Sequence, residues 1–161
     1  MILVTIGTNE QPFDRLVRVA AGLGGLESLV VQYGSSREPH GRGEWVDFLS
    51  FEELSVRMER ARVVVCHAGV GSIMLARRCG KRPLVVPRRL HLGEAVDDHQ
   101  LPIARRLHAN GVVTLVEDTD GLADAIRTVG IQARAEPLER DSAAADLAGD
   151  LREYLEGLVA A

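Results

Sequence analysis

The chain has 161 residues, which is long enough for one domain with its own buried core. Hydrophobic residues make up 46%, charged residues 26%, and there are two cysteines, which excludes a disordered chain and a disulfide scaffold. Nineteen basic residues against 23 acidic ones leave a net charge of -4, and this balance argues against a general nucleic-acid binder.

Short apolar runs rich in β-branched residues alternate with segments of helical spacing. The runs predict strands at residues 2–6, 28–33, 45–49, 62–66, 83–86 and 112–116. The first helix is predicted to be capped by Asn9 or Glu10, to hold Pro12 in its first turn and to end before Gly24. Further helices are predicted at residues 51–61, 72–79, 99–110 and 118–129.

This alternation predicts a Rossmann-like α/β domain over residues 1–129, with a parallel sheet and helices on both faces. Ligands of such sheets bind beyond the carboxyl ends of the strands, so the loops after the first, fourth and fifth strands matter most. Residues 130–141 show no apolar period and contain Pro137, which predicts a linker to a last helix within residues 142–161.

The location of the chain is predicted from what its sequence lacks. No apolar run approaches the 20 or so residues of a membrane-spanning helix. Met1 leads directly into a strand pattern with no basic segment before it, so no secretory signal is expected. We therefore expect a cytoplasmic protein with reduced thiols at Cys66 and Cys79.

Two glycine-containing loops follow predicted strands. The first is Gly7-Thr8-Asn9, and the second, HAGVGS at residues 67–72, precedes a helix. Open amides at a helix N-terminus favour anions, so a diphosphate could bind at the second loop. An ordinary turn at the first loop and a core histidine at position 67 remain alternatives. The second loop lacks the third glycine of a dinucleotide fingerprint and the Lys of a Walker loop.

The loop of residues 87–100 is long and rich in polar side chains. Its carboxylates can accept hydrogen bonds from sugar hydroxyls, and Arg88 can neutralise phosphate. The alternative is a solvated loop in which Asp97 or Asp98 caps the next helix. Adjacent residues such as Asp97, Asp98 and His99 rarely converge on one ion, so we expect no metal and no other cofactor.

Three segments in this order resemble a known family: HAGVGS (67–72), GKRPLVVPRR (80–89) and GEAVDDHQ (93–100). Together they resemble the C-terminal, nucleotide-sugar-binding half of family 28 glycosyltransferases. The resemblance is greatest to its small stand-alone versions, which are bacterial exopolysaccharide-type subunits and the eukaryotic subunit of the dolichol-linked GlcNAc transferase. The opening ILVTIGTNEQPFDRL (2–16) is similar to the start of the bacterial group, and the resemblance spans residues 2–116.

The resemblance implies the donor-binding half of a GT-B enzyme that is split over two chains. This chain would bind a UDP-sugar, and a membrane-associated partner subunit would bind a lipid-linked or polysaccharide acceptor. The reaction would be an inverting transfer of a hexosyl or N-acetylhexosaminyl group, without a required metal. The general base would lie on the partner, so no catalytic residue is assigned here. The partner would hold the chain at the inner face of the membrane.

The resemblance also implies which residues contact the substrate. They are His67, Gly69, Val70, Gly71 and Ser72 at the diphosphate, Gly7 and Thr8 across the cleft from it, Phe48 and Leu49 at the uracil, and Glu94, Asp98, His99 and Gln100 at the sugar or its phosphate-proximal hydroxyls. From their side-chain chemistry, Asn9 and Arg88 are candidate substrate contacts as well.

The chain departs from the family pattern at two positions. Many members carry Glu three residues past the loop Ser, where it binds ribose hydroxyls, but Leu75 stands here. A leucine cannot accept a hydrogen bond, so the ribose contact would move, for example to Glu94. Asn9 stands where the bacterial relatives usually show His, and Asn cannot act as a general base.

The last predicted helix carries an apolar stripe. It consists of Leu147, Leu151, Tyr154, Leu155 and Leu158. The stripe could pack on its own domain or dock the partner chain. An open docking face predicts weak self-association of the isolated chain.

Two other functions remain open. A non-catalytic nucleotide-sugar-binding module on the same fold is favoured by Leu75 and Asn9. A dehydrogenase fragment that binds NAD would need an acidic residue after the second strand, where Gly34-Ser35-Ser36 stands.

Overall fold

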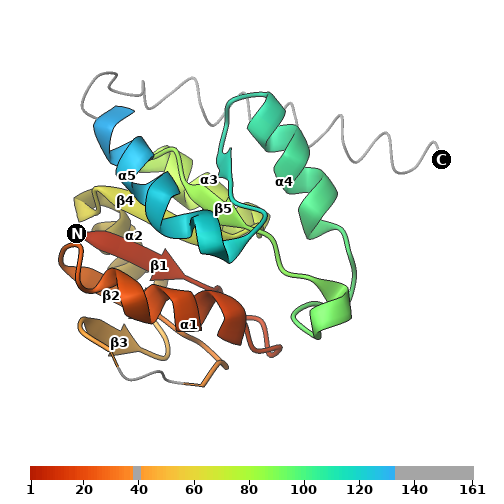
Figure 1. Ribbon diagram of the computed structural model, residues 1–161, viewed down its shortest axis with the longest axis horizontal. Helices are drawn as coiled ribbons and strands as arrows, with labels where there is room; N and C mark the ends of the chain where they lie inside the picture. Colours follow the sequence, from red (N-terminus) through yellow and green to blue (C-terminus); the bar gives the residue numbers. More distant parts are fainter. Residues whose placement is uncertain (38–40, 133–161) are drawn as a thin grey trace.

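The alternating elements form one parallel sheet with helices on both faces (Figure 1). A computed structural model describes residues 1–37 and 41–132. The strands are β1 (Ile2–Thr5), β2 (Leu29–Gln32), β3 (Glu44–Val46), β4 (Val63–His67), β5 (Leu84–Val86) and β6 (Thr114–Leu115). The helices are α1 (Asp14–Leu23), α2 (Phe51–Arg60), α3 (Val70–Arg78), α4 (Gln100–Ala109) and α5 (Leu122–Gln132). The predicted Rossmann-like fold is confirmed.

The strand order explains where a ligand site can form. The sheet runs β3-β2-β1-β4-β5-β6, and every neighbouring pair is parallel. The order reverses between β1 and β4, so the loops after these two strands leave the sheet side by side and then diverge. In open parallel sheets this switch point is where ligands bind.

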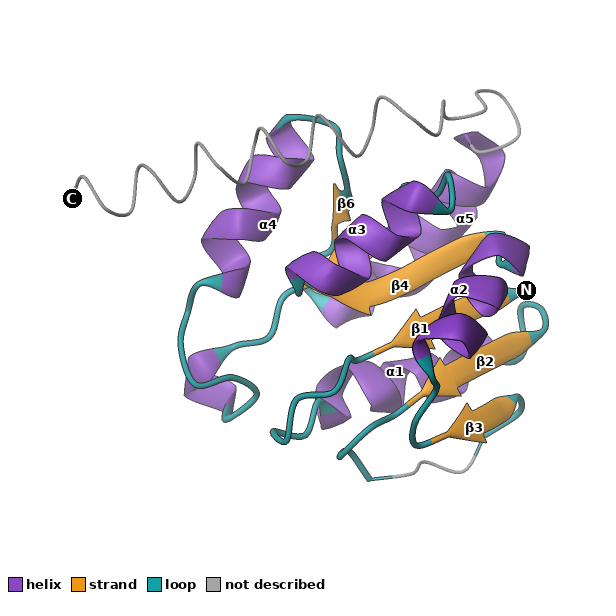
Figure 2. Cartoon of the chain, turned by 180° about the vertical axis from the view of Figure 1, so that it is seen from behind, coloured by secondary structure: helices purple, strands orange, loops and turns teal. Residues whose placement is uncertain are grey.

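The core lies on both sides of the sheet, because successive residues of each strand point to opposite faces. On β1, Ile2 and Val4 pack in one cluster with residues of α1 and α5. Leu3 packs on the other face with Met58 of α2 and Leu75 of α3. Figure 2 shows α2 and α3 on that second face. Coverage on both faces explains why the strands are nearly continuous apolar runs.

The first helix begins later than the sequence predicts. It starts at Asp14 with Phe13 as its N-cap residue, whereas a cap at Asn9 or Glu10 and Pro12 in the first turn were expected. The Asn9 side chain accepts a hydrogen bond from the backbone N of Gln11 at 3.0 Å, which folds a local turn and leaves Asn9 no helix to cap. Residues 8–13 therefore form a loop at the carboxyl edge of the sheet.

Other boundaries shift for local reasons. β3 ends at Val46, because the backbone O of Asp47 accepts from Gly34 and from the Gln32 side chain instead of continuing a strand to Leu49. α3 begins at Val70, two residues before its predicted start. A 3-10 turn, Leu90–Leu92, interrupts the predicted long loop, and another, Thr119–Gly121, precedes α5.

The predicted linker is corrected at its start, because α5 continues to Gln132. Its remainder and the last predicted helix with its apolar stripe lie outside the described residues. Within residues 1–37 and 41–132, no helix has both the length and the apolar character needed to cross a membrane.

Candidate functional site

The imidazole of His67 lies between two glycines at the switch point. Gly7 follows β1 with a φ of 77°, and a Cβ atom added there would overlap this ring. A Cβ atom on Gly69 would overlap the same ring. Glycine is therefore required at both positions for His67 to occupy this place, which ties the loop after β1 to the loop after β4.

A hollow of about 500 Å³ opens beside this histidine. The lining residues come from the ends of β1, β2 and β4, the loops after β1, β3 and β4, and the amino-terminal turns of α2 and α3. They are Thr5, Gly7, Thr8, Asn9, Gln32, Leu49, Phe51, Leu54, His67, Gly69, Gly71, Ser72 and Leu75. In the described part of the chain, no Asp, Glu, Lys or Arg lines this hollow.

The start of α3 supplies the strongest polar groups in the hollow. Gly69 is the N-cap residue and has no side chain to pair with the first helical amides. These amides and the positive end of the helix dipole favour an anion. The Ser72 hydroxyl lies in the first turn, 3.3 Å from Nε2 of His67. The arrangement can bind a phosphate group through neutral donors alone.

His67 is neutral at pH 7. Burial, and secondarily the positive charge of Arg88, lower the pKa of His67 to about 4. Its Nδ1 atom is buried and has no hydrogen-bond partner among the described residues. One ring nitrogen of a neutral imidazole carries a proton, so His67 can donate one hydrogen bond to a ligand oxygen without bringing a charge.

Acidification should destabilise the protein through His67. The unfolded state takes up a proton near pH 6.5, whereas the native state resists until about pH 4, so stability present above pH 6.5 is lost between these values. We expect a loss of about 2 kcal/mol, below the full value of the shift because the ring borders the hollow. Urea unfolding from pH 7 to pH 4.5 measures it. His67→Gln should have a much flatter profile, and equal slopes in both proteins would contradict this assignment.

Five lining residues were not predicted as site residues: the polar Thr5 and Gln32 and the apolar Phe51, Leu54 and Leu75. Thr5 and Gln32 lie opposite each other at the ends of β1 and β2. Oε1 of Gln32 accepts from the Thr5 hydroxyl at 2.6 Å, while Nε2 donates to the backbone O atoms of Gly7 and Asp47. One side chain thus positions both the loop after β1 and the loop after β3. A polar residue ending each apolar strand was the available signal.

Arg88 and Glu94, two of the predicted substrate contacts, do not line the hollow. The Arg88 side chain is fully buried, and its guanidinium donates to the backbone O atoms of Ile6, Gln11 and Glu94. The Glu94 carboxylate accepts two hydrogen bonds from Arg15. Arg88 therefore joins the loop after β1 to the loop after β5, and Glu94 joins the loop after β5 to α1.

The remaining predicted sugar contacts lie on the segment that leads into α4. Asp98 accepts from the backbone N of Leu90 at 3.2 Å, and the His99 ring pairs with Asp97 at 2.9 Å. Both side chains are exposed outside the hollow. Oε1 of Gln100 accepts from the backbone N atoms of Ala68 and Arg88, joining the loops after β4 and β5.

The two predicted uracil contacts separate in the structure. Leu49 lines the hollow, whereas Phe48 is 57% exposed and lies outside it. Val70 begins α3 beside the hollow without lining it. The other predicted residues, Gly7, Thr8, Asn9, His67, Gly69, Gly71 and Ser72, are brought together in its wall. No group of three or more metal-ligating side chains occurs within the described ranges.

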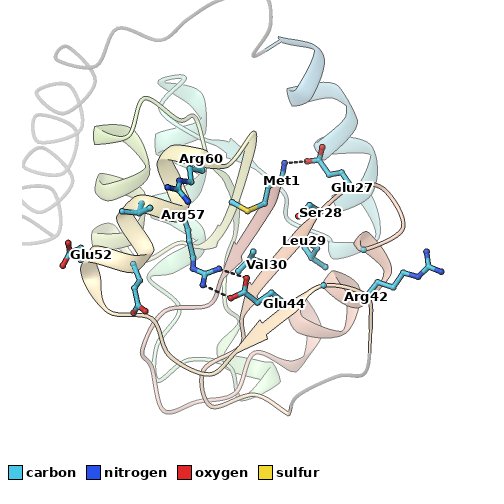
Figure 3. Close-up of a pocket in the computed structure, with 14 residues that line it drawn as sticks. Met1, Glu27, Ser28, Leu29, Val30, Arg42, Glu44, Glu52, Arg57 and Arg60 are labelled. Carbon is cyan, nitrogen blue, oxygen red and sulfur yellow. Dashed lines mark hydrogen bonds and ion pairs between the residues drawn. The ribbon is translucent and has the colours of Figure 1, made fainter.

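A larger hollow of about 900 Å³ lies at the opposite, amino-terminal edge of the sheet (Figure 3). Two ion pairs lie in its wall: Arg57 donates to both carboxylate oxygens of Glu44, and the Met1 amino group contacts Glu27. Arg42 points away from the hollow. This edge is remote from the switch point, so we place the candidate site at the smaller hollow.

Comparison with known proteins agrees with this geometry. Residues 1–151 match the family model "Glycosyltransferase family 28 C-terminal domain". The chain belongs to this family. It is 30% identical over 137 residues to the UDP-N-acetylglucosamine transferase subunit ALG13 of Yarrowia lipolytica, covering 76% of this chain and 67% of the relative.

Solved structures share the fold of this family 28 domain. The solution structure of ALG13 is 21% identical with a TM-score of 0.56, over 88% of this chain and 89% of that one. The calicheamicin glycosyltransferase CalG4 is 16% identical with a TM-score of 0.63, over 98% of this chain. This chain spans 41% of the length of CalG4. The prediction of a fold equivalent to the C-terminal half of a GT-B enzyme is confirmed.

Proposed function

We propose that this family 28 domain is the donor-binding subunit of a two-chain inverting glycosyltransferase. The observation that carries the proposal is the hollow at the switch point, where the open amides of α3, Ser72 and neutral His67 converge. These groups suit the diphosphate of a UDP-sugar, and they can stabilise the negative charge that grows on it as the sugar leaves.

The acceptor half belongs to a second chain in this proposal. A general base must deprotonate the acceptor hydroxyl, but no carboxylate lines the hollow within the described residues, and His67 packs tightly between two glycines. A partner that supplies the base and the acceptor site accounts for this. It would be membrane-associated, present a lipid-linked or polysaccharide acceptor and recruit this chain to the cytoplasmic face. The ALG13 relative carries the name of a transferase subunit, which supports this arrangement.

Gly71→Ala tests the diphosphate site without disturbing the core. Gly71 is exposed in the first turn of α3, and a Cβ atom there meets no protein atom within 4 Å. We expect UDP to bind at least about 10-fold more weakly, since the methyl group would occupy the hollow, while the fold gains about 0.5–1 kcal/mol from replacing a helical glycine. Calorimetric titration and urea unfolding measure the two effects.

Gly22→Ala is the matched control. Gly22 is also exposed, helical and free of neighbours within 4 Å, but it lies in α1 away from the hollow. It should share the gain in stability and keep wild-type UDP affinity. GDP and NAD serve as competing ligands. Wild-type protein that binds NAD, or that gives no heat with UDP, would overturn the donor-binding role.

A non-catalytic nucleotide-sugar-binding module is the second candidate, favoured by the same absence of a carboxylate from the described lining residues. The two functions differ in turnover. Transfer of labelled sugar from a UDP-sugar to the lipid fraction of membranes from the source cells, dependent on added protein, is expected of the enzyme subunit. UDP binding without such transfer would support the module.

A further inference from the structure

The hollow has two chemically different halves. The polar half contains the glycine loops, His67 and Ser72. The other half is a wall of four apolar side chains from α2, α3 and the loop before α2: Leu49, Phe51, Leu54 and Leu75. Leu75 is 6% exposed and Phe51 is 69% exposed, so the wall runs from the core to an aromatic ring at the mouth. We call these four side chains the apolar wall.

The buried polar side chains in the hollow already have hydrogen-bond partners. Gln32 is 3% exposed, and its amide is occupied by Thr5, Gly7 and Asp47. No carboxylate lines the hollow in the described part of the chain. The apolar wall itself therefore offers no side-chain acceptor to the hydroxyl groups of a sugar that lies on it, and the Ser72 hydroxyl, one turn before Leu75 in α3, is assigned to the diphosphate.

The strand order indicates which end of the donor faces the apolar wall. Three residues of the wall, Leu49, Phe51 and Leu54, follow β3 on one side of the switch point. The polar segment of Asp98 and His99 follows β5 on the other side. A diphosphate held at α3 directs its two substituents to opposite sides. The flat, weakly polar nucleoside suits the apolar wall, whereas the transferred sugar needs the polar partners on the β5 side.

We propose that the nucleoside of the donor rests on the apolar wall and that the site does not read the ribose 2′-hydroxyl. The domain then accepts pyrimidine 2′-deoxyribonucleoside diphosphate sugars as readily as UDP-sugars. This inference rests on the proposed function, and it specifies the class of donor for that same site.

The expected discrimination follows from how proteins reject analogues. A site built to hydrogen-bond a hydroxyl rejects the analogue without it by about 10⁴-fold or more, because its own polar groups are left unpaired. An apolar surface discriminates far less between compounds that differ by one hydroxyl. UDP and dUDP should therefore bind with dissociation constants within about threefold of each other.

Titration of UDP, dUDP and dTDP into the full chain tests the inference. UDP and dUDP differ only in the 2′-hydroxyl, and dUDP and dTDP only in the 5-methyl group. Threefold agreement between UDP and dUDP supports the inference. If dUDP binds more than about 30-fold more weakly than UDP, the inference fails and the donor-binding function stands. If none of the three binds, the proposed function fails as well.

Leu75→Gln would introduce a hydroxyl partner into the apolar wall. This variant should bind UDP about 10-fold more tightly than it binds dUDP, a preference that the wild type lacks. Met74→Gln is the matched control, since Met74 is the preceding residue of α3 and packs on the α4 side, away from the hollow. It should show no preference.

Phe51→Ala keeps the inference falsifiable if the buried Leu75→Gln variant does not fold. The exposed Phe51 ring at the start of α2 contributes little to the core, so this variant should fold. Loss of its contact with the nucleoside should weaken UDP, dUDP and dTDP equally, by about fivefold. Unchanged affinity for all three nucleotides would show that the nucleoside does not rest on the apolar wall and would overturn the inference.

Discussion

Replacing Arg88 with methionine is expected to lower the free energy of unfolding by about 3–5 kcal/mol. The guanidinium is buried and donates to three backbone O atoms, two in the loop between β1 and α1 and one in the loop after β5. The guanidinium carbon, Cζ of Arg88, also lies 4.8 Å from the centre of the Phe13 ring. Methionine fills similar space but leaves these buried carbonyls without donors. A lower urea midpoint with an unchanged m value would measure the effect.

Arg105→Met is the control for Arg88→Met. Arg105 donates two hydrogen bonds to the Glu117 carboxylate, but its side chain is 60% exposed. Its loss should therefore leave the urea midpoint nearly unchanged. Burial destabilises the charged form of Arg88 and lowers its pKa to about 10, although the negative charge of the nearby Glu94 raises the pKa. Equal effects of the two substitutions would show that the buried carbonyl contacts contribute no more than a surface pair.

Gly7→Ala is expected to lower the free energy of unfolding by about 3 kcal/mol, the second largest effect. The new methyl group would overlap the imidazole of His67, and overpacking of this kind costs about 1–3 kcal/mol. The φ of 77° adds about 1–2 kcal/mol for any residue with a Cβ atom. Gly69→Ala should cost less, because Gly69 has an ordinary φ of -78° and meets only the ring.

The His67→Ala variant separates the cost of overlap with the imidazole from the cost of the backbone conformation at Gly7. In His67→Ala the ring is absent, so Gly69→Ala should become nearly neutral, whereas Gly7→Ala should keep the cost of its backbone conformation. Double-mutant cycles from urea unfolding give both coupling energies. Strict additivity in both cycles would show that His67 does not pack between the two glycines.

Local sequence patterns account for most of the fold. The apolar runs predicted all six strands, and chain order was enough to expect a site at the loops after β1 and β4, since these loops share one edge of a parallel sheet. Helix starts were less accurate. The Asn9 side chain turns the chain locally, and nothing in the pattern distinguishes that turn from a helix cap.

The role of Arg88 could not be predicted from the sequence. An arginine in a polar loop normally indicates an exposed side chain. Its burial depends on carbonyl groups of Ile6 and Gln11, which lie 82 and 77 residues away in the chain. The ion pair of Glu94 could not be predicted for the same reason, because its partner Arg15 comes from α1. Contacts between distant loops require the topology before they can be inferred.

The side-chain amide oxygen of Gln100 links the loop after β4 to the loop after β5. It accepts from Ala68 after β4 and from Arg88 after β5, so these two loops cannot part without leaving backbone amides unpaired. A single side chain of α4 thus fixes the position of the loop after β4 relative to the loop after β5, and separating the two loops would cost both hydrogen bonds.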